Sequence, residues 1–182
     1  MNIRLLPKKD SKCSIWSGGL TYEFMIYPET ANYSDRDFAF RISSATIEKE
    51  PSEFTQFQGY HRYLIMLDNR LHIEINKEKK SFEKYEIMEF NSADDVVSYT
   101  KGIDFNWMVS EKISHHELKI DSSNQQYNAQ IIILFSLHTT VIHINEKPYY
   151  LNPHDLLAIE NLEKDNIMFD ISNECLCGVL DF

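Results

Sequence analysis

The stretch IEINKEKKSFEKYEIMEF at residues 73–90 aligns without a gap with IHINEKPYYLNPHDLLAIE at residues 142–160 when the chain is shifted by 69 positions. Each copy contains an apolar strand, an Asn, a short strand, an acidic residue and a second apolar strand. Asn76 falls on Asn145 and Glu86 falls on Asp155. Turn positions are not dictated by a shared apolar period, so their agreement favours two similar sheet modules. Chance similarity between two amphipathic hairpins is the alternative.

The remaining pattern is that of strands almost throughout. Short segments rich in β-branched and aromatic residues are bounded by turn residues, which is typical of β-structure. They are Leu20–Pro28, Phe38–Ile47, Arg62–Leu67, Leu71–Asn76, Ile131–Leu137 and Val141–Asn145. No segment carries a sustained helical stripe, although residues 92–100 could form one helical turn. We therefore predict a mainly β protein, in which the more polar residues 91–128 bridge the two modules.

Composition narrows the classes of protein and partner. At 182 residues, 43% hydrophobic and with a formal charge of −10, the chain can bury a sizeable core as one compact body. The negative charge argues against a nucleic-acid partner, but it leaves room for a local cationic pocket. Three cysteines without a C-x-x-C spacing favour a reducing cytoplasm, and no apolar run approaches the roughly 18 residues of a membrane span. Both a monomer and a homodimer fit this composition.

Charged residues within strand patterns are the candidate site. Arg41 and Arg62 could each hold a carboxylate through the planar guanidinium fork. Asp104 and Asn106 are two positions apart, so in a strand they would lie on one side and could hold an amide or an amine. Glu23 could pair with an arginine. The alternative is an internal ion pair that joins two sheets without binding anything.

Four motifs surround these residues in a fixed order. They are Trp16, Gly18, Gly19 and Thr21; Arg41, Ser43 and Ala45; Phe54, Phe57, Gly59 and Arg62; and Gly102, Asp104, Phe105, Asn106 and Met108. Together they resemble the HutD/Ves family, small bacterial bicupin proteins whose best known members sit with histidine-utilisation genes. The family's turn is often Asn followed by three glycines, whereas Leu20 stands at the last of these positions here. His61 stands where the family commonly has an acidic residue before the arginine.

The resemblance implies a bicupin, that is, two double-stranded β-helix barrels of the jelly-roll type packed as one body. A single domain over residues 1–182 would contain a first module at about 15–110 and a second at about 111–182. The ligand-binding residues would be drawn from the motifs and their neighbours: Trp16, Gly18, Gly19, Thr21, Glu23, Arg41, His61, Arg62, Asp104 and Asn106.

Metal and nucleophilic chemistry have little support in the sequence. Many cupins are metal enzymes with an H-x-H motif, and neither module contains one. His138, His143 and His154 could converge only through the fold, so we expect a metal-free barrel without a cofactor. No serine stands in a G-x-S-x-G setting, and no catalytic residue is assigned.

The resemblance, together with the charged residues in the strands, implies a non-catalytic, cytoplasmic bicupin that binds a small anionic carboxylate metabolite and senses or regulates histidine degradation. An intermediate such as urocanate or an N-substituted glutamate is the ligand that the resemblance implies. The first alternative is a cupin-type isomerase or hydrolase acting on a small acid, with Asp104, His61 or Glu23 in acid–base roles. The second is a structural or stress-related protein with filled barrels.

Overall fold

A computed structural model describes all residues, 1–182. The chain is mainly β, as predicted, and its helical content is one short 3₁₀ turn, Lys8–Asp10. None of its helices has the length and apolar character needed to cross a membrane. The chain divides into two compact units, one formed by Lys12–Lys112 and the other by Met1–Ser11 together with Ile113–Phe182.

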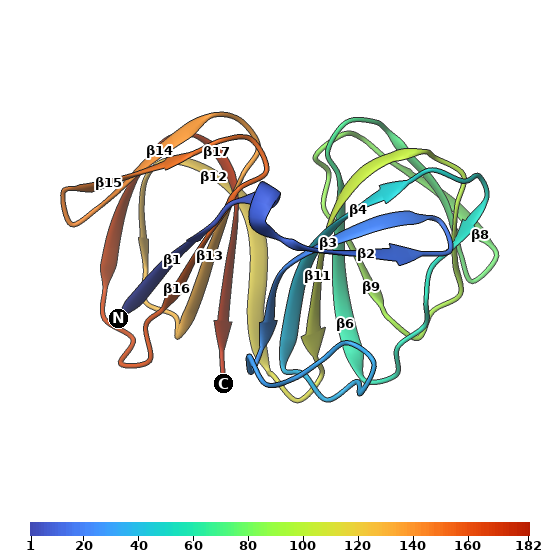
Figure 1. The fold of residues 1–182 in the computed structure, drawn as a ribbon, viewed down its shortest axis with the longest axis horizontal. Helices are drawn as coiled ribbons and strands as arrows, with labels where there is room; N and C mark the ends of the chain where they lie inside the picture. The colour runs from blue at the N-terminus through green and yellow to red at the C-terminus, as the bar shows by residue number, and fades with distance from the viewer. The chain divides into compact units, whose positions relative to one another are not determined.

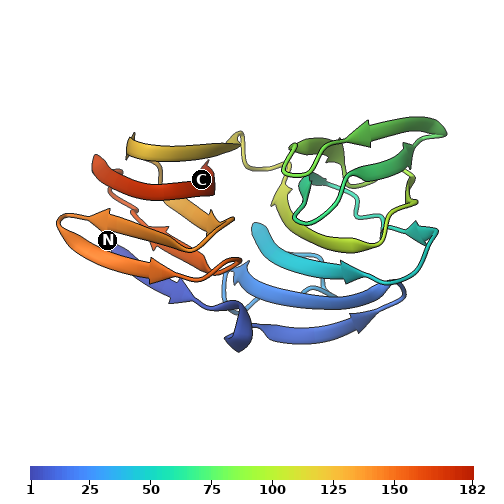
Figure 2. The ribbon, with the colours of Figure 1, turned by 90° about the horizontal axis from the view of Figure 1, so that it is seen from above.

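The Lys12–Lys112 unit contains two antiparallel sheets (Figure 1). The six-stranded sheet has the order β2-β3-β4-β11-β6-β9, and the four-stranded sheet has the order β5-β10-β7-β8. The strands of this unit curve around an interior, which is visible in Figure 2. Their bounds are β2 Lys12–Trp16, β3 Gly19–Tyr27, β4 Phe40–Ile47, β5 Ser52–Glu53, β6 Tyr60–Met66, β7 Leu71–Ile75, β8 Glu78–Phe82, β9 Met88–Asn91, β10 Val96–Ser98 and β11 Gly102–Ser110.

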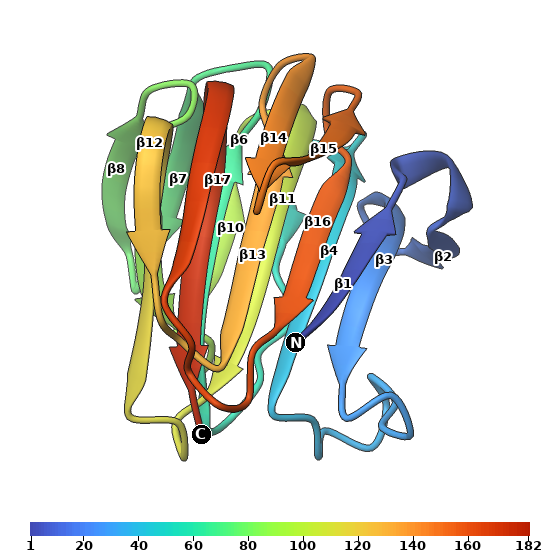
Figure 3. The same cartoon turned by 90° about the vertical axis from the view of Figure 1, so that its left-hand side faces the viewer.

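The second unit is a single seven-stranded sheet (Figure 3). Its order is β1-β16-β13-β17-β14-β15, and β12 pairs with β17. The bounds are β1 Asn2–Leu6, β12 His115–Tyr127, β13 Ile131–Ser136, β14 Thr140–Ile144, β15 Lys147–Leu151, β16 Leu156–Glu160 and β17 Ile167–Asp181. Strand β1 therefore pairs with β16, a strand from the other end of the chain.

Apolar side chains fill the interior of this second unit. Alternate residues of its strands point inward, which follows from the period of two along a strand. The cluster contains Tyr127, Ala129, Ile132, Leu134, Ile142, Ile144, Leu151, Leu157, Ile159, Ile167, Phe169, Ile171, Cys175 and Cys177, all of them buried. A ligand-sized polar interior is therefore not built here.

The interior of the Lys12–Lys112 unit is divided between an apolar and a polar part. The apolar cluster contains Ile47, Leu64, Met66, Leu71, Ile73, Ile75, Met88, Phe90 and Val96. Strand β6 enters this cluster through Leu64 and Met66, and the preceding residue of the same face is Arg62. The switch from leucine to arginine on one strand face marks the border between the two parts.

The two copies of the sequence repeat adopt the same turn. Asn76 and Lys77, between β7 and β8, have φ of 50° and 71°. Asn145 and Glu146, between β14 and β15, have φ of 49° and 66°. Two successive residues with positive φ define the type I′ hairpin turn, and asparagine is among the residues that tolerate it best. The shared asparagine is thus explained by backbone geometry.

The shared acidic residue also has one structural role in both copies. The Glu86 carboxylate accepts a hydrogen bond from the Glu83 backbone N–H at 2.7 Å. The Asp155 carboxylate accepts one from the Asn152 backbone N–H at 2.9 Å. Each side chain closes a tight turn before an apolar strand, which is a usual function of carboxylates in turns.

All six strand segments predicted from the sequence are present, but one expectation is wrong. Residues 91–128 contain the connection between the two units at Lys112 and Ile113, and they also contribute β10 and β11 to one unit and β12 to the other. Residues 92–100 contain β10 and no helical turn. The two longest strands, β12 with 13 residues and β17 with 15, are not among the predicted segments. The exposed and polar face of β12 hides the alternation on which strand prediction depends.

Candidate functional site

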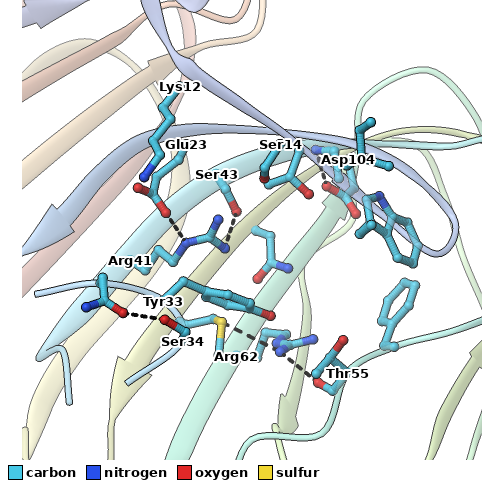
Figure 4. A pocket seen from close by; sticks show the side chains of 18 of the residues that line it. Lys12, Ser14, Glu23, Tyr33, Ser34, Arg41, Ser43, Thr55, Arg62 and Asp104 are labelled. Atoms are coloured by element: carbon cyan, nitrogen blue, oxygen red, sulfur yellow. Dashed lines mark hydrogen bonds and ion pairs between the residues drawn. The ribbon is translucent and has the colours of Figure 1, made fainter. Parts of the chain in front are cut away.

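A cavity of about 420 Å³ lies at the polar part of the Lys12–Lys112 unit (Figure 4). This volume falls in the range of small-molecule sites. Its wall is formed by Lys12, Ser14, Ile15, Trp16, Thr21, Glu23, Ala31, Asn32, Tyr33, Ser34, Arg41, Ser43, Ala45, Phe54, Thr55, Arg62, Asp104, Asn106 and Met108. Apart from Lys12, its charged groups come from four neighbouring strands, β3, β4, β11 and β6.

Strand register arranges these side chains in three successive rows across the sheet. In the first row, Met108 of β11 lies between Arg41 of β4 and Arg62 of β6. The second row pairs Asn106 with Ser43, and the third pairs Asp104 with Ala45. Because every second residue of a strand faces the same side, the three β11 residues point into one cavity.

Arg41 is already engaged by protein groups. Its Nε donates to a carboxylate oxygen of Glu23 at 2.6 Å, and its Nη1 donates to Ser43 Oγ at 3.2 Å. The Tyr33 ring stacks on its guanidinium, 4.3 Å from the ring centre. Figure 4 shows Arg41 between Glu23, Ser43 and Tyr33. A charge-assisted pair of this kind holds the guanidinium in place and neutralises part of its charge.

Arg62 is less satisfied. Its Nη2 donates to the Thr55 carbonyl at 3.2 Å and lies 3.6 Å from the Met108 sulfur, while its buried Nε has no hydrogen-bond partner. The residue is 4% exposed, and burial lowers its pKa to about 10, so it stays protonated at neutral pH. A buried cation without a carboxylate partner is costly. Arg62 is therefore the group in this cavity that is best prepared to receive an anion.

Asp104 is a buried carboxyl on the same wall. Its Oδ1 accepts a hydrogen bond from the Ala45 backbone N–H at 2.8 Å. Burial raises the pKa of Asp104 to about 7, against the lowering effects of that hydrogen bond and of the charges of Arg62 and Arg41. The carboxyl therefore changes its protonation state near neutral pH, which also makes it a candidate acid or base.

On β11, Asn106 lies between Asp104 and Met108, the residue that pairs with both Arg41 and Arg62. Its side-chain oxygen is buried and has no hydrogen-bond partner. Ser43, its neighbour in the same row, accepts a hydrogen bond from Arg41. Buried polar atoms are normally satisfied, so this amide oxygen is an exception among the residues that line the cavity.

The Gly18 and Gly19 pair shapes the wall without contributing to its lining. A Cβ on Gly18 would lie 2.2 Å from the Trp16 ring, and one on Gly19 would lie 2.2 Å from the Thr46 carbonyl. The Trp16 indole therefore folds over Gly18, where its Nε1 donates to Thr46 O at 3.2 Å. The ring meets Phe54 edge to face with centroids 6.4 Å apart. The glycines position an aromatic wall of the cavity.

The segment between β3 and β4 was not recognised as part of the site from the sequence. Its residues 31–34 line the cavity. Tyr33 contacts the Phe57 ring at 4.7 Å in addition to Arg41. Loop composition alone does not indicate which side chain folds inward, so no sequence signal distinguishes Tyr33 from its neighbours.

Seven of the ten residues predicted to bind ligand line the cavity: Trp16, Thr21, Glu23, Arg41, Arg62, Asp104 and Asn106. Gly18 and Gly19 act through Trp16. His61 lies outside the cavity, because it precedes Arg62 on β6 and points to the opposite face. There its Nε2 lies 3.3 Å from a Glu89 carboxylate oxygen, and its ring packs on Tyr63.

The cavity is electropositive relative to the rest of the chain. Three cationic side chains, Lys12, Arg41 and Arg62, share it with two carboxyl groups, Glu23 and Asp104. In a protein with a formal charge of −10, this is a local reversal of sign. The chain contains no group of three or more His, Cys, Asp or Glu side chains arranged to hold a metal ion. The site thus resembles an anion pocket formed by arginine and amide groups.

Comparison with solved structures places this architecture among cupin-like β proteins. A cupin 2 conserved barrel domain protein from Leptotrichia buccalis superimposes with a TM-score of 0.56 at 10% identity, covering 92% of this chain and 89% of that one. HutD from Pseudomonas fluorescens SBW25, solved in a formate condition, has a TM-score of 0.84 at 20% identity, covering 99% and 98%. A conserved protein of unknown function from Pseudomonas aeruginosa PAO1 has a TM-score of 0.85 at 20% identity and covers 100% of both chains.

The family profile of HutD matches residues 8–177. The chain therefore belongs to the HutD family, as the four sequence motifs indicated. No curated protein sequence matches it significantly.

Proposed function

We propose that this chain is a non-catalytic bicupin whose Lys12–Lys112 unit binds a small carboxylate metabolite. Arg62 is the anion-binding group, since it is buried and protonated, lines the cavity and has an Nε without a hydrogen-bond partner. Arg41 has a different role: its pair with Glu23 and its stack on Tyr33 form the rigid side of the pocket. The orphaned Nε of Arg62 is the single observation that supports the proposal most strongly.

The bicupin arrangement is part of the proposal. The repeated hairpin with its positive-φ asparagine and its turn-closing carboxylate occurs once in each compact unit, which supports two modules of common design. One module keeps a polar cavity and the other has an apolar interior. Within the HutD family, whose name refers to histidine utilisation, binding would report the level of a pathway intermediate to a partner that acts on it.

The test is binding of carboxylates to wild type and to Arg62→Met, which keeps an unbranched side chain and removes the guanidinium and its charge. Urocanate, N-formylglutamate and succinate are the probes, measured by thermal shift and calorimetry. A hydrogen bond to a charged group contributes about 1.5–3 kcal/mol, so affinity should fall roughly 10- to 150-fold in the variant. Arg70→Met is the matched control, because Arg70 is exposed and pairs with Glu83 at the surface.

Equal binding by Arg62→Met and wild type would refute the assignment of Arg62. Absence of binding by every carboxylate would refute the proposed function, because a ligand at about 100 times its dissociation constant stabilises a fold by roughly 2.7 kcal/mol. Loss of binding in Arg70→Met would show that the effect is one of general charge.

An enzyme is the second candidate, favoured by one observation. Asp104, with its pKa raised to about 7, shares the cavity with Arg62, as a general acid or base near a substrate carboxylate would. Incubation of the same probes with the protein, followed by NMR, tests this candidate. Conversion that disappears in Asp104→Asn would establish it, and unchanged probes would leave Asp104 with the structural and electrostatic roles described above.

A further inference from the structure

Arg62 and Asn106, one row apart on the cavity wall, need different hydrogen-bonding partners. Arg62, in the row of Met108, requires an acceptor, since a guanidinium has donors only. Asn106 is two residues from Met108 along β11, which places its row about 7 Å away at the backbone. Its buried oxygen requires a donor. One ligand that satisfies both groups needs chemically different ends.

The protein groups beside Asn106 leave its side-chain oxygen without a partner. The Ser43 hydroxyl oxygen accepts a hydrogen bond from Arg41 Nη1, and Arg41 Nε donates to Glu23. Asp104, in the next row, accepts the Ala45 N–H. Asn106 thus lines the cavity with a side-chain oxygen that no protein donor reaches.

We propose that Asn106 selects, among small carboxylates, those that also carry an N–H or O–H donor a short chain away from the carboxylate. This inference rests on the proposed function, in which Arg62 binds the carboxylate. A plain carboxylate would fill the Arg62 position and leave the Asn106 oxygen buried and unsatisfied. Sites that hydrogen-bond a ligand donor discriminate strongly against analogues that lack it, because the buried group then remains unpaired.

Amide and ester pairs isolate this one donor, because the ester oxygen replaces the N–H with almost no change in shape. Three pairs, with one, two or three methylene groups between the carboxylate and the amide or ester, cover a range of distances. They are N-acetylglycine with acetoxyacetate, N-acetyl-β-alanine with 3-acetoxypropanoate, and 4-acetamidobutanoate with 4-acetoxybutanoate. In wild type, the amide of at least one pair should bind more tightly than its ester, on the order of ten- to a hundredfold. Calorimetric titration measures both affinities on the full chain.

Asn106→Leu removes the polar atoms at similar volume and should bring the two affinities of the pair within about twofold of each other, with ester binding retained. Asn124→Leu, at an exposed position of β12 in the other unit, is the control and should keep the preference. Equal affinities of amide and ester in wild type would overturn the inference, as would a preference that survives in Asn106→Leu. The wild-type comparison needs no variant, so poor folding of Asn106→Leu does not prevent the test.

Failure of the inference and failure of the proposed function give different results. If amides and esters bind equally and Arg62→Met weakens both, the carboxylate site stands and the donor selectivity is wrong. If none of the six acids binds to wild type, the proposed carboxylate function itself is wrong. If the amide preference is lost in Asn106→Leu alone, the assignment of Asn106 is correct.

Discussion

Asp104→Asn should change how the stability of the Lys12–Lys112 unit depends on pH. Asparagine has nearly the same shape, and its side-chain oxygen can still accept the Ala45 N–H, but it cannot ionise. Burial raises the pKa of Asp104 from its ordinary value of 3.8 to about 7 in the folded chain. Between these values the folded protein holds a proton that the unfolded chain has released, so wild-type stability falls as pH rises.

The magnitude follows from the size of the shift. Each pKa unit corresponds to 1.36 kcal/mol, so the full effect of a shift from 3.8 to about 7 is roughly 4 kcal/mol. In the accessible window from pH 5 to pH 8, the wild type should lose roughly 3 kcal/mol relative to Asp104→Asn. The stabilising contribution of the neutral carboxyl is fully present below about pH 4 and is lost as pH passes through 7.

Urea denaturation followed by tryptophan fluorescence is the suitable assay. Both tryptophans, Trp16 and Trp107, belong to the Lys12–Lys112 unit, so the signal reports on the unit that contains Asp104. The quantity of interest is the difference in unfolding free energy between the two proteins at pH 5, 6, 7 and 8. Groups common to both proteins cancel in this difference when they do not interact with Asp104.

Three charged groups do interact with Asp104: Arg62 and Arg41 lower its pKa, and Asp68 raises it. A difference that stays constant from pH 5 to pH 8 would refute a shifted carboxyl. A difference that changes in the opposite direction, with wild type gaining stability as pH rises, would show that attraction to the arginines outweighs burial.

Two further predictions concern the cavity wall and the thiols. Gly18→Ala should displace the Trp16 indole, because the new Cβ would lie 2.2 Å from the ring. We expect the free energy of unfolding, measured by urea denaturation, to fall by about 1–3 kcal/mol and the tryptophan emission to shift to the red. An unchanged free energy and an unchanged emission would contradict this packing. One thiol, Cys13, should react with Ellman's reagent in the native protein and all three in guanidinium, because Cys13 is exposed whereas burial raises the pKa of Cys175 to about 12 and also raises that of Cys177. Rapid native reaction of a second thiol would show that the interior of the other unit opens.

The repeated hairpin was the most informative part of the sequence because its geometry is local. A type I′ turn needs two residues with positive φ, and the asparagines at positions 76 and 145 indicate such a turn in the sequence. The charged residues Arg41 and Arg62 were also recognisable, since a cation within a strand alternation is unusual. Their different roles were not recognisable, because the pairing of Arg41 with Glu23 depends on the register of β3 against β4.

The features that the sequence did not predict correctly depend on long-range structure. Strand β12 is polar on one side and irregular in register near Asp121 and Ser123, so its alternation is broken. The contribution of Tyr33 depends on the path of a loop between two strands, which no periodicity encodes. His61 was placed in the site through its sequence neighbourhood to Arg62, although adjacent residues of a strand face opposite sides.

Strands β1 and β16 pair with each other although most of the chain lies between them in sequence. Arg4 and Glu160, which form a hydrogen-bonded ion pair across these strands, are 156 positions apart. At ribosomal rates of about 5–20 residues per second, β1 emerges roughly 8–30 s before its partner strand exists. During that interval the Lys12–Lys112 unit is synthesised in one continuous run, whereas β1 remains an unpaired strand edge. Nascent chains stalled before residue 156 should therefore present β1 to chaperones, and this strand should gain protection from proteases only after β16 has emerged.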